Sequence, residues 1–262
     1  MANITLNNGR LLGDFLRPYI VAELNTSHFG KIEVAKEMVE KAKEVGCDCV
    51  KFQSWTVDTL YSQGFYRENK IAERFVKKFS FSAEQLAILA RHAREVGIDF
   101  ASTPYSIDEA KFLVDDCSVP FIKIASMELN NIPFLEELAS LNSALVLSTG
   151  MGELEEIISA VDVITRYGVP LVVLHCTSIY PASAPLLNLQ NIVGLREAIP
   201  DVPIGFSDHS QGSVAPSAAS ALGICLLEKH FTLDKTQIGM DNQMACEPSE
   251  MSEVVESCAF VF

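Results

Sequence analysis

The sequence has little positive charge. Its 262 residues include 20 Lys and Arg against 34 Asp and Glu, which gives a formal net charge of −14. Nucleic acids and anionic membranes bind basic surfaces, so neither is expected as a partner. Apolar runs are short, and none approaches the roughly 18 residues of a membrane-spanning helix. The N-terminal segment MANITLNNGR lacks the build of a signal peptide, so we expect a cytoplasmic protein with small-molecule partners.

Cysteine motifs for metal or redox sites are also missing. The seven cysteines are scattered through apolar segments without CxxC spacing, which predicts reduced and buried thiols. No GxGxxG loop follows the first apolar run, and this argues against an open nucleotide-binding sheet. With 48% hydrophobic and 21% charged residues, the chain has the composition of a globular protein.

What the sequence does contain is a regular alternation of apolar runs and amphipathic stretches. The apolar, β-branched runs predict strands at 19–24, 49–53, 98–102, 121–126, 144–149, 171–176, 203–208 and 224–230. The amphipathic stretches predict helices at 32–45, 83–96, 107–114, 133–140, 154–167, 188–198, 214–222 and 249–257. Eight such pairs within about 250 residues predict an α/β protein, a single (β/α)8 TIM barrel spanning residues 1–262. The long connection 54–80 shows no obvious structure and is expected to be a functional lid or insert.

Polar residues interrupt the apolar runs near the carboxyl ends of the predicted strands, where the active site of such a barrel forms. They include Glu23, Lys51, Gln53, Thr103, Lys123, Ser126, Glu128, Ser148, His175, Tyr180, Ser207, His209, Glu228 and His230. A charge inside a barrel is unfavourable unless it is paired or bound to a ligand. Lysines, carboxylates, histidines and hydroxyls together predict an oxygen-rich anionic ligand that carries phosphate and carboxylate, with a divalent metal nearby.

The histidines at the strand ends are expected to have different roles. His209 and His230 end two adjacent strands, and we expect them to share a metal ion that keeps other positions for water and substrate. His175 directly follows an apolar run and is expected to be a hydrogen-bonded structural residue.

The lysines admit two uses. Lys51 and Lys123 are flanked by apolar residues and are expected to supply positive charge for the anion, although a Schiff-base aldolase would use a barrel lysine as its nucleophile. Lys229 is adjacent to His230, so the alternation of side chains along a strand predicts that it faces the helices.

The motifs in their order along the chain resemble one family. PYIVAEL with His28 and Gly30, VKFQ, STP, FIKIAS with Glu128, LSTGM, HCTSIYP, IGFSDH, EKHFTLDK, and Asp241 with EP at 247–248 are similar to those of the sialic acid synthase (N-acetylneuraminate synthase) family. That family includes the legionaminic and pseudaminic acid synthases. Its catalytic domain is a (β/α)8 barrel, which agrees with the strand count.

The resemblance implies a transferase that condenses phosphoenolpyruvate with an open-chain N-acylated amino sugar of the N-acetylmannosamine type. The product is a nine-carbon 2-keto acid of the sialic type, and phosphate is released. It also implies a divalent metal, with Mn²⁺ first and Mg²⁺ or Co²⁺ as alternatives, held by the residues that match His209 and His230.

Site residues follow from the same resemblance. Lys51, Thr103, Lys123, Ser126, Ser148 and Ser207 match residues that hold phosphoenolpyruvate. Glu23, Gln53, Tyr180 and Asp241 match residues that contact the sugar, and Glu128 matches a carboxylate near the reacting carbons. The catalytic candidates are Glu23, Lys51, Lys123 and Glu128.

The chain departs from the family pattern in two segments. AELNTSHFG stands where many relatives read AEIGxNHNG, and GMDNQMACEP keeps the aspartate of the family's tail motif but lacks its proline. Both changes bear on which amino sugar is used. The family also carries a C-terminal antifreeze-like domain that lends an arginine to the partner subunit's sugar site. We expect this domain to be absent from the sequence, which leaves open whether the chain forms a homodimer.

Two other functions remain as alternatives. A related barrel synthase of the 3-deoxy-octulosonate phosphate type would use a sugar phosphate, and its second phosphate calls for more basic residues than this acidic chain has. A non-catalytic ligand-binding homologue is the other alternative, and the intact Lys51, Lys123, His209 and His230 argue against it.

Overall fold

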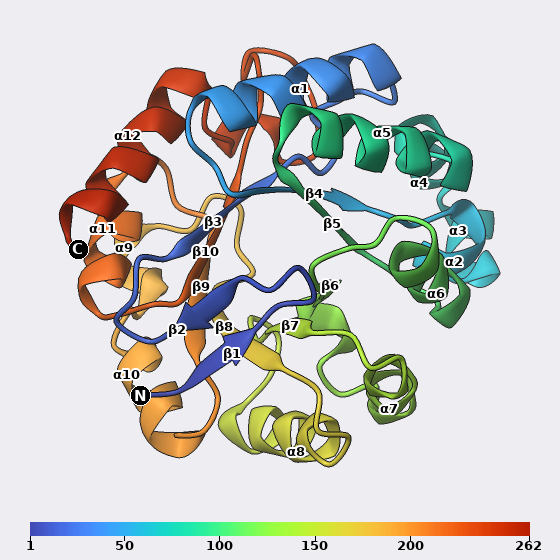
Figure 1. Cartoon of the computed structure of the whole chain (residues 1–262). Coiled ribbons are helices and arrows are strands. Elements are labelled where there is room, and N and C mark those ends of the chain that lie inside the picture. The colour runs from blue at the N-terminus through green and yellow to red at the C-terminus, as the bar shows by residue number, and fades with distance from the viewer.

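A computed structural model describes the whole chain, residues 1–262, and its centre is a closed parallel barrel of eight strands. The strands are β3 (Tyr19–Glu23), β4 (Cys49–Gln53), β5 (Asp99–Thr103), β6 (Ile122–Ile124), β7 (Leu145–Ser148), β8 (Leu171–Cys176), β9 (Ile204–Asp208) and β10 (Leu226–His230). They follow one another around the barrel in chain order, and β10 closes it against β3 (Figure 1). The predicted (β/α)8 fold is confirmed.

A ring of helices surrounds the barrel (Figure 1). They are α1 (Ile32–Glu44), α5 (Ala83–Val96), α6 (Ile107–Asp115), α7 (Ile132–Ser140), α8 (Leu154–Thr165), α10 (Asn191–Ala198), α11 (Val214–Ala221) and α12 (Pro248–Phe260). The main hydrophobic core lies between these helices and the outward side chains of the strands. Local sequence sets the helix ends: Ser82 caps α5 by accepting from the Gln85 amide, and Gly97 ends α5 with a φ of +80°.

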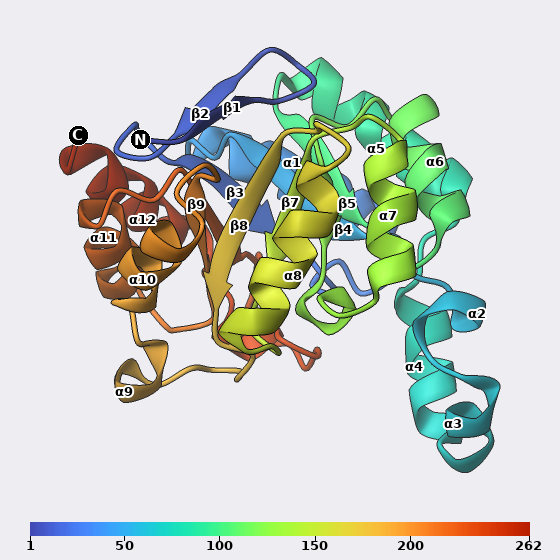
Figure 2. The same cartoon turned by 90° about the horizontal axis from the view of Figure 1, so that it is seen from below.

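An N-terminal hairpin closes the barrel at the end where the strands begin. Its strands β1 (Asn3–Thr5) and β2 (Leu11–Gly13) pair antiparallel, and they lie against that end in Figure 2. Leu6 and Leu12 join the core inside the barrel, next to side chains such as Tyr19 and Leu226. Strands of three residues are too short to show a periodic pattern, so the sequence did not predict this hairpin.

The connection after β4 is an insert, as expected, and it contains three helices that the sequence did not show. They are α2 (Val57–Leu60), α3 (Gln63–Glu68) and α4 (Lys70–Phe79), and they project from the barrel in Figure 2. Trp55, Leu60, Tyr66 and Val76 form a small separate core that holds them together. Short helices held by their own contacts give little periodic signal in the sequence.

The remaining elements are three single turns: η1 (Ser126–Glu128), α9 (Ala184–Leu187) and η2 (Asn242–Met244). All seven cysteines are free and buried, as predicted. None of the helices has the length and apolar character needed to cross a membrane.

Candidate active site

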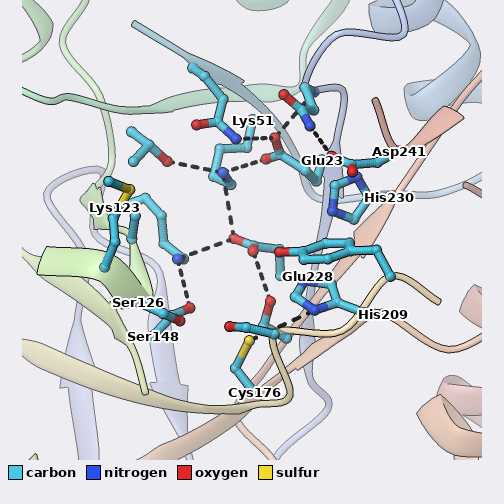
Figure 3. A pocket seen from close by; sticks show the side chains of 18 of the residues that line it. Glu23, Lys51, Lys123, Ser126, Ser148, Cys176, His209, Glu228, His230 and Asp241 are labelled. Carbon is cyan, nitrogen blue, oxygen red and sulfur yellow. Dashed lines mark hydrogen bonds and ion pairs between the residues drawn. The ribbon is translucent and has the colours of Figure 1, made fainter. Parts of the chain in front are cut away.

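A cavity of about 290 Å³ opens at the carboxyl ends of the barrel strands (Figure 3). All but one of the predicted site residues line it: Glu23, Lys51, Gln53, Thr103, Lys123, Ser126, Ser148, Tyr180, Ser207, His209, His230 and Asp241. Tyrosine, methionine and cysteine side chains complete the wall, including Tyr105, Met127, Met151 and Cys176. The expectation that the strand ends converge on one site is therefore fulfilled.

Strand register explains why these side chains meet. Glu23 is in register with Lys51 on one side and with His230 on the other. Since alternate side chains on a strand point to the same face, the residues two positions before Glu23 and Lys51 fill the barrel below the cavity with apolar groups. Val21 and Cys49 belong to this inner core. These two strands thus contribute apolar packing first and a polar group at their ends.

Two buried lysines and two buried glutamates form the floor of the cavity (Figure 3). Lys51 pairs with Glu23 and donates to the Thr103 hydroxyl at 3.0 Å. Lys123 donates to the Ser148 hydroxyl at 2.7 Å. Glu228 accepts from Ser207 at 2.9 Å, and its other oxygen lies 3.8 Å from the Lys51 nitrogen and 3.9 Å from the Lys123 nitrogen.

Burial and pairing shift the pKa values of these four groups in different directions. Burial raises the pKa of Glu23 to about 7, although Lys51 opposes the shift. Glu228 is equally buried, but Lys123 and Lys51 hold its pKa below the usual range. The two carboxylates outweigh burial at Lys51 and raise its pKa, whereas burial lowers the pKa of Lys123. Glu23 is therefore the carboxylate best suited to exchange a proton near neutral pH.

His209 and His230 lie side by side on the cavity wall, with ring centroids 5.5 Å apart. The Nδ1 atom of His209 is 2.7 Å from the Thr177 carbonyl, which makes it the donor and leaves Nε2 with a free lone pair. No protein group hydrogen-bonds to the imidazole of His230, and burial together with repulsion from His209 lowers its pKa, so it is neutral. Burial lowers the pKa of His209, but the neighbouring Cys176 raises it, and the pKa is raised overall.

The histidine pair fits a divalent cation with an open coordination sphere. Two imidazoles are suitable ligands, but no group of three or more His, Cys, Asp and Glu side chains is arranged to enclose a metal. Such an ion would take its remaining ligands from water and substrate oxygens.

A second part of the cavity is made mainly of hydrogen-bond acceptors. Asn25 donates from Nδ2 to the Asp241 carboxylate and from its backbone amide to Glu23 Oε1, at 3.1 Å for the latter. Gln53 donates to the same Glu23 oxygen at 3.3 Å, and its own carbonyl accepts from the Tyr105 hydroxyl at 2.6 Å. These contacts fix the positions of the Glu23, Asp241 and Gln53 side chains on this part of the cavity wall.

Glu128 is the predicted site residue that does not line the cavity. It belongs to the turn η1, and its carboxylate accepts from the Asn131 side chain at 2.7 Å. Glu128 is therefore not found at the expected position beside the reacting carbons, because the turn after β6 directs its side chain toward Asn131. The central carboxylate of the site is Glu228 instead.

The expectations for the other two strand-end residues are confirmed. His175 lies outside the barrel wall, where its Nε2 is 2.7 Å from the Leu187 carbonyl and its ring stacks on Phe206. Lys229 also points away from the cavity and pairs with buried Asp208 at 2.5 Å.

Several lining residues had no specific role in the sequence-based predictions, among them Asn25, Tyr105, Cys176 and Glu228. Glu228 precedes His230 by two positions, so strand alternation places both on the inner face and could have identified it. Tyr105 follows Thr103 at the same spacing, but it lies beyond the strand, where alternation no longer applies. Cys176 is the last residue of β8 and lies two positions after Leu174 of the inner core, so the same alternation could have identified it.

Comparisons with known proteins agree with this geometry. The model of the NeuB family matches residues 38–261. The chain is 36% identical to the N,N'-diacetyllegionaminic acid synthase of Legionella pneumophila, across 98% of this chain and 75% of that protein. It is 34% identical to human N-acetylneuraminate-9-phosphate synthase, across 97% of this chain and 72% of that protein.

A solved structure shows the same likeness in three dimensions. The N-acetylneuraminic acid synthetase of Leptospira borgpetersenii, crystallised with citrate, superposes with a TM-score of 0.91 at 31% identity. The match covers 99% of this chain and 88% of that one.

Proposed function

Because this chain belongs to the NeuB family, the family of sialic-acid-type synthases, we propose that it condenses phosphoenolpyruvate with an open-chain N-acylated amino sugar. The product is a nine-carbon 2-keto acid, and the enzyme is a transferase that releases phosphate. The observation that carries the proposal is the pair of buried lysines, Lys51 and Lys123, which face the histidine pair inside a single cavity.

Phosphoenolpyruvate suits the part of the cavity that contains the lysines and hydroxyls. Its carboxylate and phosphate would accept hydrogen bonds from Lys123 and from Ser148, which already bond each other. Ser126, Thr103 and Ser207 line the same cavity and add neutral donors. Lys51 bridges toward the carboxylates of the other part, so it lies where the two substrates would meet.

The proposed condensation has three steps. The C3 carbon of phosphoenolpyruvate attacks the aldehyde carbon of the open-chain sugar, and the aldehyde oxygen takes up a proton. Water adds to C2, and the C2–O bond to phosphate then breaks, which leaves the 2-keto group and inorganic phosphate. Glu23 is the residue that we assign to proton exchange, since it is the carboxylate with a pKa of about 7. Gln53, Tyr180 and Asp241 would bind the sugar.

His209 and His230 would hold a divalent cation, with Mn²⁺ as the first candidate and Mg²⁺ or Co²⁺ as alternatives. When bound, this ion supplies Lewis acidity for the aldehyde carbonyl. The Thr177 carbonyl accepts from His209 Nδ1, which fixes the tautomer of this histidine and leaves Nε2 free for the ion.

A direct assay tests the proposal. Purified protein with Mn²⁺, phosphoenolpyruvate and N-acetylmannosamine or its 2,4-diacetamido analogue should release phosphate and form an equal amount of a 2-keto acid. Omission of the sugar is the control and should stop phosphate release. Absence of product with every N-acyl amino sugar, or phosphate release that does not need sugar, would contradict it.

At Lys51 the Schiff-base alternative is disfavoured by charge. The carboxylates of Glu228 and Glu23 raise the pKa of Lys51, which keeps its amine protonated and therefore not nucleophilic. Lys123 donates to the Ser148 hydroxyl and shares its cavity with His209 and His230. A Schiff-base aldolase does not need such a histidine pair.

A further inference from the structure

Asn25 has features that packing alone does not explain. It directly follows β3 and its side chain lines the cavity, where it is only 6% exposed. Its φ of +35° is unusual for a residue other than glycine. The Nδ2 atom donates to the Asp241 carboxylate. This fixes the orientation of the amide, because in the flipped orientation two acceptor oxygens would face each other. The buried Oδ1 atom is left without any hydrogen-bond partner.

The surroundings of Asn25 offer acceptors and negative charge. Asp241 and Glu23, its two hydrogen-bond partners, are both carboxylates. Among all lining residues, the only lysines are Lys51 and Lys123, and no arginine is present. Figure 3 shows Lys123 with Ser148 on one side of the cavity and Asp241 with His230 on the other, with Lys51 pairing with Glu23 between them.

We propose that Asn25, together with Asp241, is a specificity determinant that selects an amino sugar without a phosphate group. This inference rests on the proposed function. The unpaired Oδ1 atom accepts from a hydroxyl or amide N–H of the sugar, and pairing a buried acceptor is favourable. A sugar phosphate would instead bring a dianion toward Asp241 and Glu23, where no arginine and no further lysine side chain lines the cavity to pair with it.

The first experiment compares two acceptors in the wild-type protein. With Mn²⁺ and saturating phosphoenolpyruvate, we expect kcat/KM for N-acetylmannosamine to exceed that for its 6-phosphate by at least about 100-fold. A preference for the 6-phosphate would overturn the inference while leaving phosphoenolpyruvate condensation intact. Product from neither acceptor would count against the proposed function, and the binding experiment would then decide the inference.

Binding is measured with N-acetylmannosaminitol, the reduced open-chain sugar, which has no aldehyde and cannot react. Isothermal titration calorimetry with Mn²⁺ present should show that Asn25→Gly raises its Kd about 3- to 10-fold, as for one lost neutral hydrogen bond. Glycine tolerates the positive φ, so the backbone is not strained by this change. The 6-phosphate of the same alcohol should bind much more weakly than the alcohol to the wild type.

Asn142→Gly is the matched control, since Asn142 also has a positive φ, of 53°, and does not line the cavity. It should leave the Kd of the alcohol unchanged. Asn25→Asp keeps the side-chain volume but removes the donor to Asp241, and it should also weaken binding of the alcohol. An unchanged Kd in both Asn25 variants, or equal affinity of the wild type for the alcohol and its phosphate, would refute the role of Asn25.

Discussion

Glu228 and Lys123 face each other across the barrel, with the carboxylate oxygen Oε2 3.9 Å from the ammonium nitrogen. Their strands, β10 and β6, lie on opposite sides of the closed sheet. The same oxygen lies 3.8 Å from the Lys51 nitrogen, so this carboxylate helps to balance two buried ammonium groups, of which Lys51 also pairs with Glu23. This balance exists before any substrate binds and has consequences for both stability and anion binding.

Glu228→Gln should destabilise the ligand-free protein by about 3–5 kcal/mol, because it removes one partner of a buried ion pair. Phosphoenolpyruvate should then raise the Tm of the variant more than that of the wild type, since the bound anion replaces the missing charge. Thermal unfolding with and without phosphoenolpyruvate measures both effects. Glu33→Gln is the control, as Glu33 pairs with Lys36 on the exposed face of α1. Equal ligand-induced shifts in the variant and the wild type would contradict the proposed balance.

Lys123→Met should impair phosphoenolpyruvate binding while keeping the length of the side chain. The loss of a hydrogen bond to a charged group, about 1.5–3 kcal/mol, corresponds to a fall in kcat/KM for phosphoenolpyruvate of about 10- to 150-fold. Steady-state phosphate release at varied phosphoenolpyruvate concentration measures it. Lys41→Met removes a lysine of α1 that pairs with exposed Glu44 and should not change this constant. A wild-type KM in the Lys123 variant would remove this lysine from the anion site.

His209→Ala should abolish Mn²⁺-dependent turnover, with a decrease of about 100-fold or more, because one of the two imidazole ligands is lost. Electron paramagnetic resonance of free Mn²⁺ should show weaker metal binding, and circular dichroism should show an unchanged fold. His92→Ala is the control, since His92 pairs with Glu40 on the helical surface. An undiminished rate in His209→Ala would overturn the metal assignment.

His28 should make the stability of the protein depend on pH. Its ring stacks on Phe81 with centroids 4.1 Å apart, its Nδ1 accepts from the Gly30 amide, and burial lowers its pKa from 6.5 to about 3. Because the unfolded chain binds this proton first, His28 causes no loss of stability above pH 6.5. As the pH falls from about 6.5 to about 3, it removes up to about 1.4 kcal/mol per pH unit.

Urea unfolding at several pH values between 7 and 4 measures this effect. In His28→Asn, which keeps an acceptor but does not titrate, the free energy of unfolding should fall less steeply with decreasing pH than in the wild type. Other buried histidines titrate equally in both proteins and cancel in the comparison. Parallel curves would show that the pKa of His28 is not lowered in the folded protein.

Local patterns were sufficient for most of the barrel. Each predicted strand has an observed counterpart because runs such as LVVLHC are apolar on both faces, as strands covered by helices must be. The β1–β2 hairpin and the helices of the 54–80 insert were missed, since short elements are stabilised by contacts with distant residues rather than by their own periodicity.

The sequence by itself determined which chemical groups collect at the strand ends, because a closed parallel barrel brings all its carboxyl ends together. Lys51, Lys123, His209 and His230 followed from that rule alone. Only the tertiary structure decided how the groups pair. It set Glu228 between two lysines, turned Glu128 away from the cavity, and joined Asn25 to Asp241 across 216 positions of the chain. Such pairings depend on side-chain direction and on loops outside the strands, where alternation gives no guidance.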